Sequence, residues 1–93
     1  MYSFERSDLL VKILRKLAKR DKVRYEATLK KIEEICKDPQ HYKNLRHDLK
    51  NLKRAHIDSS FVLVFEVDKN VKHIKFLDLD HHDRIYENWK GRA

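Results

Sequence analysis

Residues 61–65, with the sequence Phe-Val-Leu-Val-Phe, form the apolar run that most constrains how this chain can fold. Every residue in the run is β-branched, aromatic or leucine, and the run is too short for a buried helix. It therefore predicts a strand that is buried on both faces. Turn-forming residues follow at positions 68–70, and residues 71–79 resume the strand pattern. The two strands are predicted to form a hairpin at the centre of a sheet.

Two amphipathic helices are predicted before this hairpin. Ser7 and Asp21 are suitable N-cap residues for the first and the second helix, and the second helix should end before Pro39. Apolar residues recur after each cap at the spacing of one helix face. These residues are Leu9, Leu10, Ile13, Leu14 and Leu17 in the first helix, and Tyr25, Leu29, Ile32 and Cys36 in the second. The helices form an antiparallel hairpin that must pack on the sheet.

The remaining segments complete an α+β domain. Residues 2–5 are predicted to form a short edge strand, residues 53–57 a further strand, and residues 83–89 a short C-terminal helix. Residues 41–54 combine leucines with many cations and suit either a short helical turn or an irregular loop. The order of elements predicts one domain over residues 1–93, a small, mostly antiparallel sheet with the N-terminal helical hairpin on one face. The other face should be free to bind a partner.

The charge of the chain narrows the class of partner. The 93 residues carry a formal net charge of +7, which favours a polyanion such as nucleic acid, although a basic surface can also serve solubility alone. No stretch is apolar enough to cross a membrane, and the N-terminus does not resemble a signal peptide. The lone Cys36 offers neither a disulfide nor a thiolate metal site. We therefore expect a cytoplasmic protein.

Histidines flank the central hairpin and suggest phosphodiester cleavage. This reaction needs groups that accept and donate protons, and positive charge near the phosphate. His56 and His82 have suitable side chains, because imidazole titrates near neutral pH. Tyr86 lies one helical turn after His82, and Phe61 could stack on a base. The cations before His56 that are expected to line the same groove are Lys50, Lys53 and Arg54.

A metal site is a weaker alternative for residues 78–83, Asp-Leu-Asp-His-His-Asp. Imidazoles and carboxylates are common metal ligands. Alternation along a strand, however, would place Asp80 and His82 on one side and His81 and Asp83 on the other. We therefore predict no metal and no small-molecule cofactor.

Two passages, LRHDLKNLKRAHIDSSFVLVFEV and IKFLDLDHHDRIY, resemble the RelE/ParE toxin superfamily, and RelE-type and YafQ-type members in particular. The shared order is a basic segment, a histidine or lysine at a strand entry, an apolar central strand, and a terminal histidine followed by an aromatic residue. The resemblance covers nearly the whole chain. It implies a RelE-like microbial RNase-type fold and the toxin of a type II toxin–antitoxin system.

The resemblance also implies an activity and partners. The toxin would be a ribosome-dependent endoribonuclease (an mRNA interferase) that cleaves mRNA without a metal, with the 2′-hydroxyl as nucleophile. It would bind mRNA on the ribosome and a small RelB-like antitoxin. The implied catalytic residues are His56, His82, Tyr86, Arg54 and Lys50. The expected RNA-binding residues are Lys43, Arg46, His47, Lys53, Phe61 and Arg84.

The sequence departs from the family pattern at two positions. Where relatives often carry an arginine, this chain has Val62 and Asp78. Arg54, Lys50 or Arg84 would then have to stabilise the transition-state charge. Two alternatives follow, a ParE-like inhibitor of a topoisomerase and an RNA-binding module without catalysis. The nuclease hypothesis further requires that His56 and His82 lie on one side of the sheet and are not sealed inside it.

Overall fold

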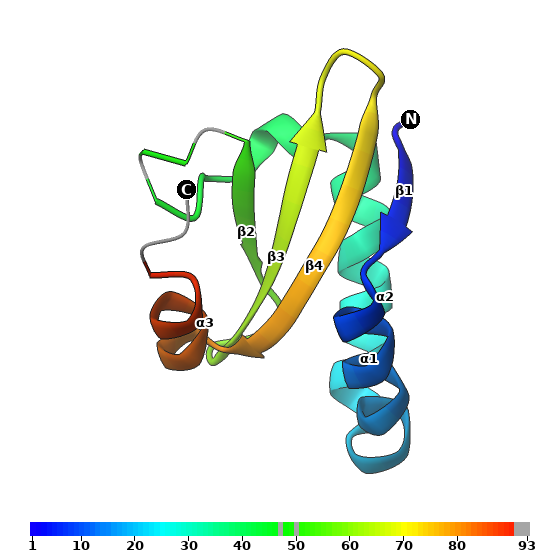
Figure 1. The fold of residues 1–93 in the computed structure, drawn as a ribbon. Coiled ribbons are helices and arrows are strands. Elements are labelled where there is room, and N and C mark those ends of the chain that lie inside the picture. The colour runs from blue at the N-terminus through cyan, green and yellow to red at the C-terminus, as the bar shows by residue number, and fades with distance from the viewer. Residues whose placement is uncertain (47, 50, 91–93) are drawn as a thin grey trace.

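A four-stranded sheet with helices on both faces forms the protein (Figure 1). The computed structural model describes residues 1–90 with the exception of residues 47 and 50. The elements are β1 (Ser3–Arg6), α1 (Asp8–Arg20), α2 (Lys22–Lys37), a 3-10 turn (Pro39–His41), β2 (Leu52–His56), β3 (Phe61–Asp68), β4 (His73–His81) and α3 (His82–Asn88). The predicted α+β class is confirmed, and the element bounds differ from the predicted ones by one or two residues.

The strands lie in the order β1-β4-β3-β2. β3 pairs antiparallel with both β2 and β4, whereas β1 pairs parallel with β4. The four core residues Val62 to Phe65 of β3 are completely buried, as the apolar run predicts. β4 begins two residues later than predicted, because the turn continues through Lys72, which has a positive φ of 52°.

The helical hairpin α1–α2 covers one face of the sheet. Its caps are as predicted, since the side chains of Ser7 and Asp21 accept hydrogen bonds from the backbone N–H groups of Leu10 and Arg24. The buried face is shifted from the predicted one: Leu9 and Leu29 are exposed, and Ile35 is buried instead. The main core lies between this hairpin and the sheet and includes Leu10, Leu14, Ile32, Ile35, Leu63, Phe65, Ile74, Phe76 and Leu79.

The opposite face of the sheet is not free, contrary to the prediction. Ile85 of α3 and Leu45 pack there against Val62 and Val64 and form a second, smaller core. Leu45 belongs to the basic segment before β2, and the residues of this segment that the structure describes form an irregular loop between the 3-10 turn and β2, as in the loop alternative. The basic segment therefore binds to the sheet through its leucines, and only the edge and ends of this face remain accessible.

Candidate functional site

Three strands bring the predicted histidines to one end of the sheet. His56 ends β2 and pairs with Val62, while Phe61 begins β3 and pairs with His81 at the end of β4. The backbone N–H of His82 donates a hydrogen bond of 2.8 Å to the carbonyl of Ser60. We call this region, formed by His56, Phe61, His81 and His82, the histidine end of the sheet. In Figure 1 it lies at the bottom, where β4 runs into α3.

His56 and Arg54 lie on the α3 side of the sheet. They alternate along β2 with Ala55, which belongs to the core under α1 and α2. Their partners on β3, Val62 and Val64, belong to the core beside α3. The α3 helix packs on this same side through Ile85, but the His82 ring stacks on the His81 ring, which contacts Phe61 of the main core. His56 is exposed and the His82 side chain is 42% exposed, so neither histidine is sealed inside the protein.

A basic hollow of about 380 Å³ opens at the β2 edge. Its polar lining residues are Lys31, His41, Tyr42, Lys43, Arg54 and His56. Within the described residues, Nε of Arg54 is buried and makes no hydrogen bond. A buried donor without a partner costs about 1–3 kcal/mol, and an anion in the hollow would reach this atom only if the Arg54 side chain moved. The hollow therefore has the charge of an anion site, to which Arg54 contributes as a lining residue.

The hollow includes three residues that the sequence analysis did not select: Lys31, His41 and Tyr42. Burial, and then the charges of Glu34 and Asp38, raise the pKa of the Tyr42 hydroxyl. Lys31 comes from α2 and is distant from β2 in the sequence. No sequence pattern links it to His56, because only the tertiary fold brings the two residues to the same hollow.

His82 and Tyr86 do not line this hollow. Tyr86 lies on α3 with 39% of its surface exposed, and Arg84 lies beside it, 3.8 Å from the carboxylate of Asp80. The structure thus groups the predicted catalytic residues in two places, with His56 and Arg54 in the basic hollow and His82 and Tyr86 at α3. The predicted residues Lys50 and His47 lie outside the described residues.

The geometry does not favour the RNA-binding role predicted for Lys53. This residue is only 8% exposed, and its ammonium donates hydrogen bonds to the carbonyl of Tyr42 (3.0 Å) and to Oδ1 of Asn44 (3.1 Å). Burial, with a smaller effect of the nearby Lys69, lowers the pKa of Lys53. Its side chain therefore holds the basic segment to β2 instead of facing a phosphate.

Arg46 and Lys43 differ in their availability. Arg46 binds Asp48 through two hydrogen bonds, from Nε (3.1 Å) and from an Nη atom (2.7 Å), and this carboxylate raises its pKa. The charge of Arg46 is therefore partly neutralised by Asp48. Lys43 is exposed and lines the basic hollow, so it is better placed to contact RNA.

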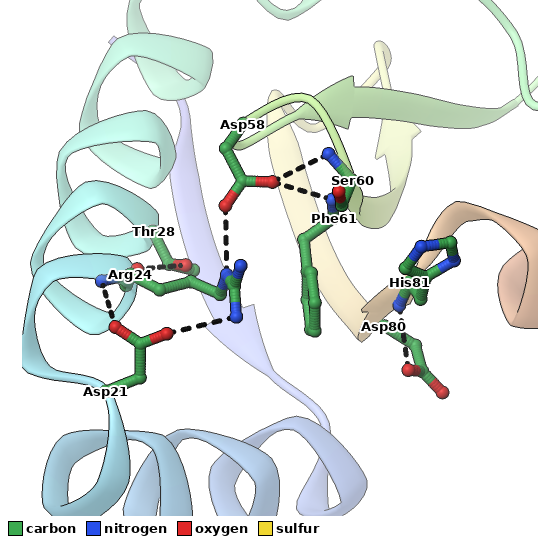
Figure 2. A network of polar contacts seen from close by, with 8 residues as sticks. All are labelled: Asp21, Arg24, Thr28, Asp58, Ser60, Phe61, Asp80 and His81. Carbon is green, nitrogen blue, oxygen red and sulfur yellow. Dashed lines mark hydrogen bonds and ion pairs between the residues drawn. The ribbon is translucent and has the colours of Figure 1, made fainter.

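Phe61 is held in place by an arginine from α2 (Figure 2). The guanidinium carbon of Arg24 lies 3.9 Å from the centre of the Phe61 ring, and Nε of Arg24 donates to Asp58 at 2.9 Å. A second hydrogen bond of 3.0 Å joins Arg24 to Asp21. Because Arg24 covers one face of the ring, only the rest of the ring is left for a base.

Asp58 connects this arginine to the start of β3 (Figure 2). Its Oδ1 accepts hydrogen bonds of 2.8 Å from the backbone N–H groups of Ser60 and Phe61. Burial alone would raise the pKa of Asp58, but these two bonds and Arg24 outweigh it and lower the pKa to about 2. The network therefore stabilises the ionised carboxylate and fixes the loop between β2 and β3.

At the end of β4, side chains that strand alternation was expected to separate lie close together. The strand ends at His81 and α3 begins at His82, so strand alternation stops between them. The rings of His81 and His82 stack with 4.5 Å between their centroids, and Asp83 follows on the same turn. Ligand atoms of these three residues lie within 4.8 Å of one another. The predicted separation of His81 and Asp83 from His82 is wrong.

Among the described residues, no helix is both long enough and apolar enough to cross a membrane.

Comparisons with known proteins agree with this arrangement. Residues 5–86 match the family of the ParE toxin of the type II toxin–antitoxin system parDE. A protein of Methanocaldococcus jannaschii that bears the name "Putative toxin RelE4" is 59% identical over 90 residues, which are 97% of this chain and 96% of that protein.

Solved structures share the fold. A YoeB/ParE toxin from Agrobacterium tumefaciens has a TM-score of 0.74 at 12% identity and covers 86% of this chain and 98% of its own. The archaeal RelE–RelB complex from Pyrococcus horikoshii has a TM-score of 0.64 at 20% identity, with 99% and 98% covered. The RelE-like fold expected from the sequence is therefore confirmed. The family match extends over most of the chain, and the protein is a toxin of the RelE/ParE family of type II toxin–antitoxin systems.

Proposed function

We propose that this toxin is an endoribonuclease that cleaves mRNA on the translating ribosome and needs no metal for the reaction. The observation that carries this proposal is a hollow in which His56 lies together with three cations, Lys31, Lys43 and Arg54. A hollow of this kind combines a donor for a phosphate oxygen with a group that can transfer a proton.

In the proposed reaction, one histidine takes the proton of the 2′-hydroxyl, and the 2′-oxygen forms a bond to the adjacent phosphorus. The bond from phosphorus to the 5′-oxygen breaks, and the leaving oxygen takes a proton from a second group. The products are a 2′,3′-cyclic phosphate and a 5′-hydroxyl. His56 and His82 are the proposed proton-transfer pair, Arg54 and Lys43 contact the phosphates, and Tyr86 or Phe61 stacks on a base.

The ribosome has a specific part in this proposal. His56 and His82 lie at the same end of the sheet, but they do not share the basic hollow. An RNA strand held in the decoding region would run from the hollow to α3 and be presented to both histidines. Since translating ribosomes are the target, the proposed location is the cytoplasm.

A small antitoxin is the proposed protein partner. The structural neighbour from Pyrococcus horikoshii is a RelE–RelB complex, and the one from Escherichia coli is a DinJ–YafQ complex. This chain has a largely apolar hollow of about 510 Å³ between β1 and α2, lined in part by Tyr2, Phe4, Leu29 and Ile32. An amphipathic helix with acidic residues would complement both this hollow and the net charge of +7.

Mapping of mRNA ends on purified translating ribosomes tests the nuclease. We expect the wild-type protein to produce new 5′ ends, and we expect His56→Ala and His82→Ala each to reduce cleavage by about 10²–10⁴-fold, the usual contribution of a general acid or base. His73→Ala is the matched control, because His73 lies at the opposite end of β4 from His81. Intact mRNA on arrested ribosomes would contradict the proposal.

Inhibition of a topoisomerase is the second candidate function, because the matching family is described as the ParE toxin. In that case mRNA would stay intact while DNA supercoiling by gyrase is lost. Binding of a topoisomerase needs no groups that titrate near neutral pH, so His56→Ala and His82→Ala would keep full inhibition. The same two variants therefore separate the two functions.

A further inference from the structure

We propose that His81, His82 and Asp83 form a binding site for a divalent transition-metal ion of the Zn²⁺ class, and that the bound ion blocks His82. The binding site stands on its own geometry, whereas the block of His82 rests on the proposed nuclease function. All three residues lie at the junction of β4 and α3, within the histidine end of the sheet.

The distances between the ligand atoms fit one ion. Nδ1 of His82 lies 2.9 Å from Oδ1 of Asp83, and Nδ1 of His81 lies 3.7 Å from Oδ2 of the same carboxylate. Zn²⁺ binds nitrogen and oxygen ligands at about 2.0–2.2 Å, so two ligands in a tetrahedral site are about 3.4 Å apart. The two observed distances, each to a different oxygen of Asp83, lie on either side of this value, and the stacked rings of His81 and His82 must turn away from each other for both nitrogens to point at one ion.

The ligand chemistry also favours this class of ion. Two imidazoles and one carboxylate suit Zn²⁺ and similar ions, whereas Mg²⁺ prefers oxygen ligands alone. The side chains are 39%, 42% and 77% exposed for His81, His82 and Asp83, so an ion and one or two water molecules can reach them. Three protein ligands would leave a coordination position open to water.

Contacts that these side chains make now must be replaced, the ring stack and the contact between Nδ1 of His82 and Asp83 among them. The backbone N–H of Asp83 donates a weak hydrogen bond of 3.3 Å to Nδ1 of His81, which also makes His81 the N-cap of α3. This N–H is exposed to solvent, so water can take over the contact when Nδ1 binds the ion. His81→Asn is therefore an informative variant, because asparagine is a good N-cap residue and a poor ligand for Zn²⁺.

An ion bound to His82 would prevent this side chain from accepting a proton. A ring nitrogen that coordinates an ion cannot accept a proton, and the ion's charge makes the whole ring a weaker base. If His82 transfers a proton in mRNA cleavage, Zn²⁺ at this site inhibits cleavage. His81 is not among the proposed catalytic residues, so removal of its imidazole separates metal binding from catalysis.

Calorimetric titration of the untagged full-length protein with ZnCl₂ tests the site. We expect binding of one ion per chain, no binding of Mg²⁺, and a loss of affinity of at least about tenfold in both His81→Asn and Asp83→Asn, since even changes around a ligand weaken metal binding about 10–100-fold. The control is His73→Ala, whose imidazole faces the single carboxylate of Glu5. No Zn²⁺ binding, or equal binding by wild type and both site variants, would overturn the proposal.

The cleavage assay then tests the consequence. Zn²⁺ should inhibit the wild-type protein and leave His81→Asn active at the same ion concentration. Equal inhibition of both proteins would refute the block of His82. If the wild-type protein cleaves no mRNA even without Zn²⁺, the proposed function fails, while the calorimetric result for the site remains valid.

Discussion

Lys53 and Arg54 are neighbouring cations on β2 with different roles, one in the stability of the fold and the other at the basic hollow. Lys53 is buried, and its ammonium is bound to Tyr42 and Asn44. Arg54 faces the basic hollow, where its buried Nε has no partner among the described residues. Lys53 therefore contributes to the fold, and Arg54 is the residue available to a ligand.

Substitution of each cation by methionine distinguishes a role in stability from a role in cleavage. Lys53→Met leaves two acceptors without a donor and should lower the free energy of unfolding by about 1–3 kcal/mol, with cleavage by the folded protein unchanged. Arg54→Met removes a buried donor that has no partner in the described part of the chain, so stability should stay the same or rise by up to about 1–3 kcal/mol. Cleavage should nevertheless fall about 10²–10³-fold. Urea unfolding and mRNA cleavage measure the two effects, and the opposite pattern would contradict this assignment.

Asp58 gives a second prediction at the residue scale, concerning pH. Its pKa of about 2 in the folded protein is below its usual value, so its contribution to stability is complete above about pH 4 and is lost as the pH falls through 2. The full shift would correspond to about 2.4 kcal/mol, but the side chain is 36% exposed, and we expect about 1 kcal/mol after solvent screening.

Urea unfolding of Asp58→Asn at pH 7 and pH 2.5 measures this contribution. The variant should be about 1 kcal/mol less stable than wild type at pH 7, and the difference should shrink at pH 2.5. The control is Asp68→Asn, because Asp68 also accepts two backbone hydrogen bonds in a turn. A difference between wild type and Asp58→Asn that does not depend on pH would refute the role of the ionised carboxylate.

At the scale of elements, Ser7 fixes the position of α1 on the sheet. Its Oγ accepts a hydrogen bond of 3.1 Å from the N–H of Leu10 and donates one of 2.7 Å to the carbonyl of Leu77 on β4. The first bond caps the helix, and the second joins the helix to a strand that is distant in the sequence. One hydroxyl therefore serves both local and tertiary structure.

Ser7→Ala should lower the free energy of unfolding by about 1–2 kcal/mol, since both hydrogen bonds are lost. Urea denaturation followed by circular dichroism measures the change. Ser59→Ala is the control, because Ser59 is an exposed serine in the loop between β2 and β3. If the two variants are equally stable, the hydroxyl of Ser7 does not hold α1.

At the scale of the whole molecule, the net charge of +7 favours RNA, but only the fold decides which cations are near a binding site. Lys43 lines the basic hollow, whereas Lys16 is exposed on α1 and does not line it. Cations that contact phosphates release counterions from the RNA, and each such contact steepens the salt dependence of binding.

Lys43→Gln should therefore reduce the slope of log affinity against log salt concentration by about 0.7 for a single-stranded RNA, and Lys16→Gln should leave the slope unchanged. Binding of a fluorescent oligonucleotide at several salt concentrations measures both slopes. Equal slopes in the two variants would show that the basic hollow is not the RNA-binding surface.

The sequence alone determined the elements of this protein and their class. Local rules are sufficient for this: the apolar run of β3, the caps Ser7 and Asp21, and the turn at Asp68 depend on residues that are close in the chain. The resemblance in residues 45–67 and 74–86 also indicated the family.

Only the tertiary structure decided which residues meet. The tertiary fold adds Lys31 of α2 to the hollow. Leu45 and α3 cover Val62 and Val64 on the second face of the sheet, and the strand-to-helix junction brings His81, His82 and Asp83 together. Periodicity describes the direction of side chains within one element. It contains no information on the contacts between elements or on the residue at which one element ends and the next begins, and the sites proposed for this toxin lie at such points.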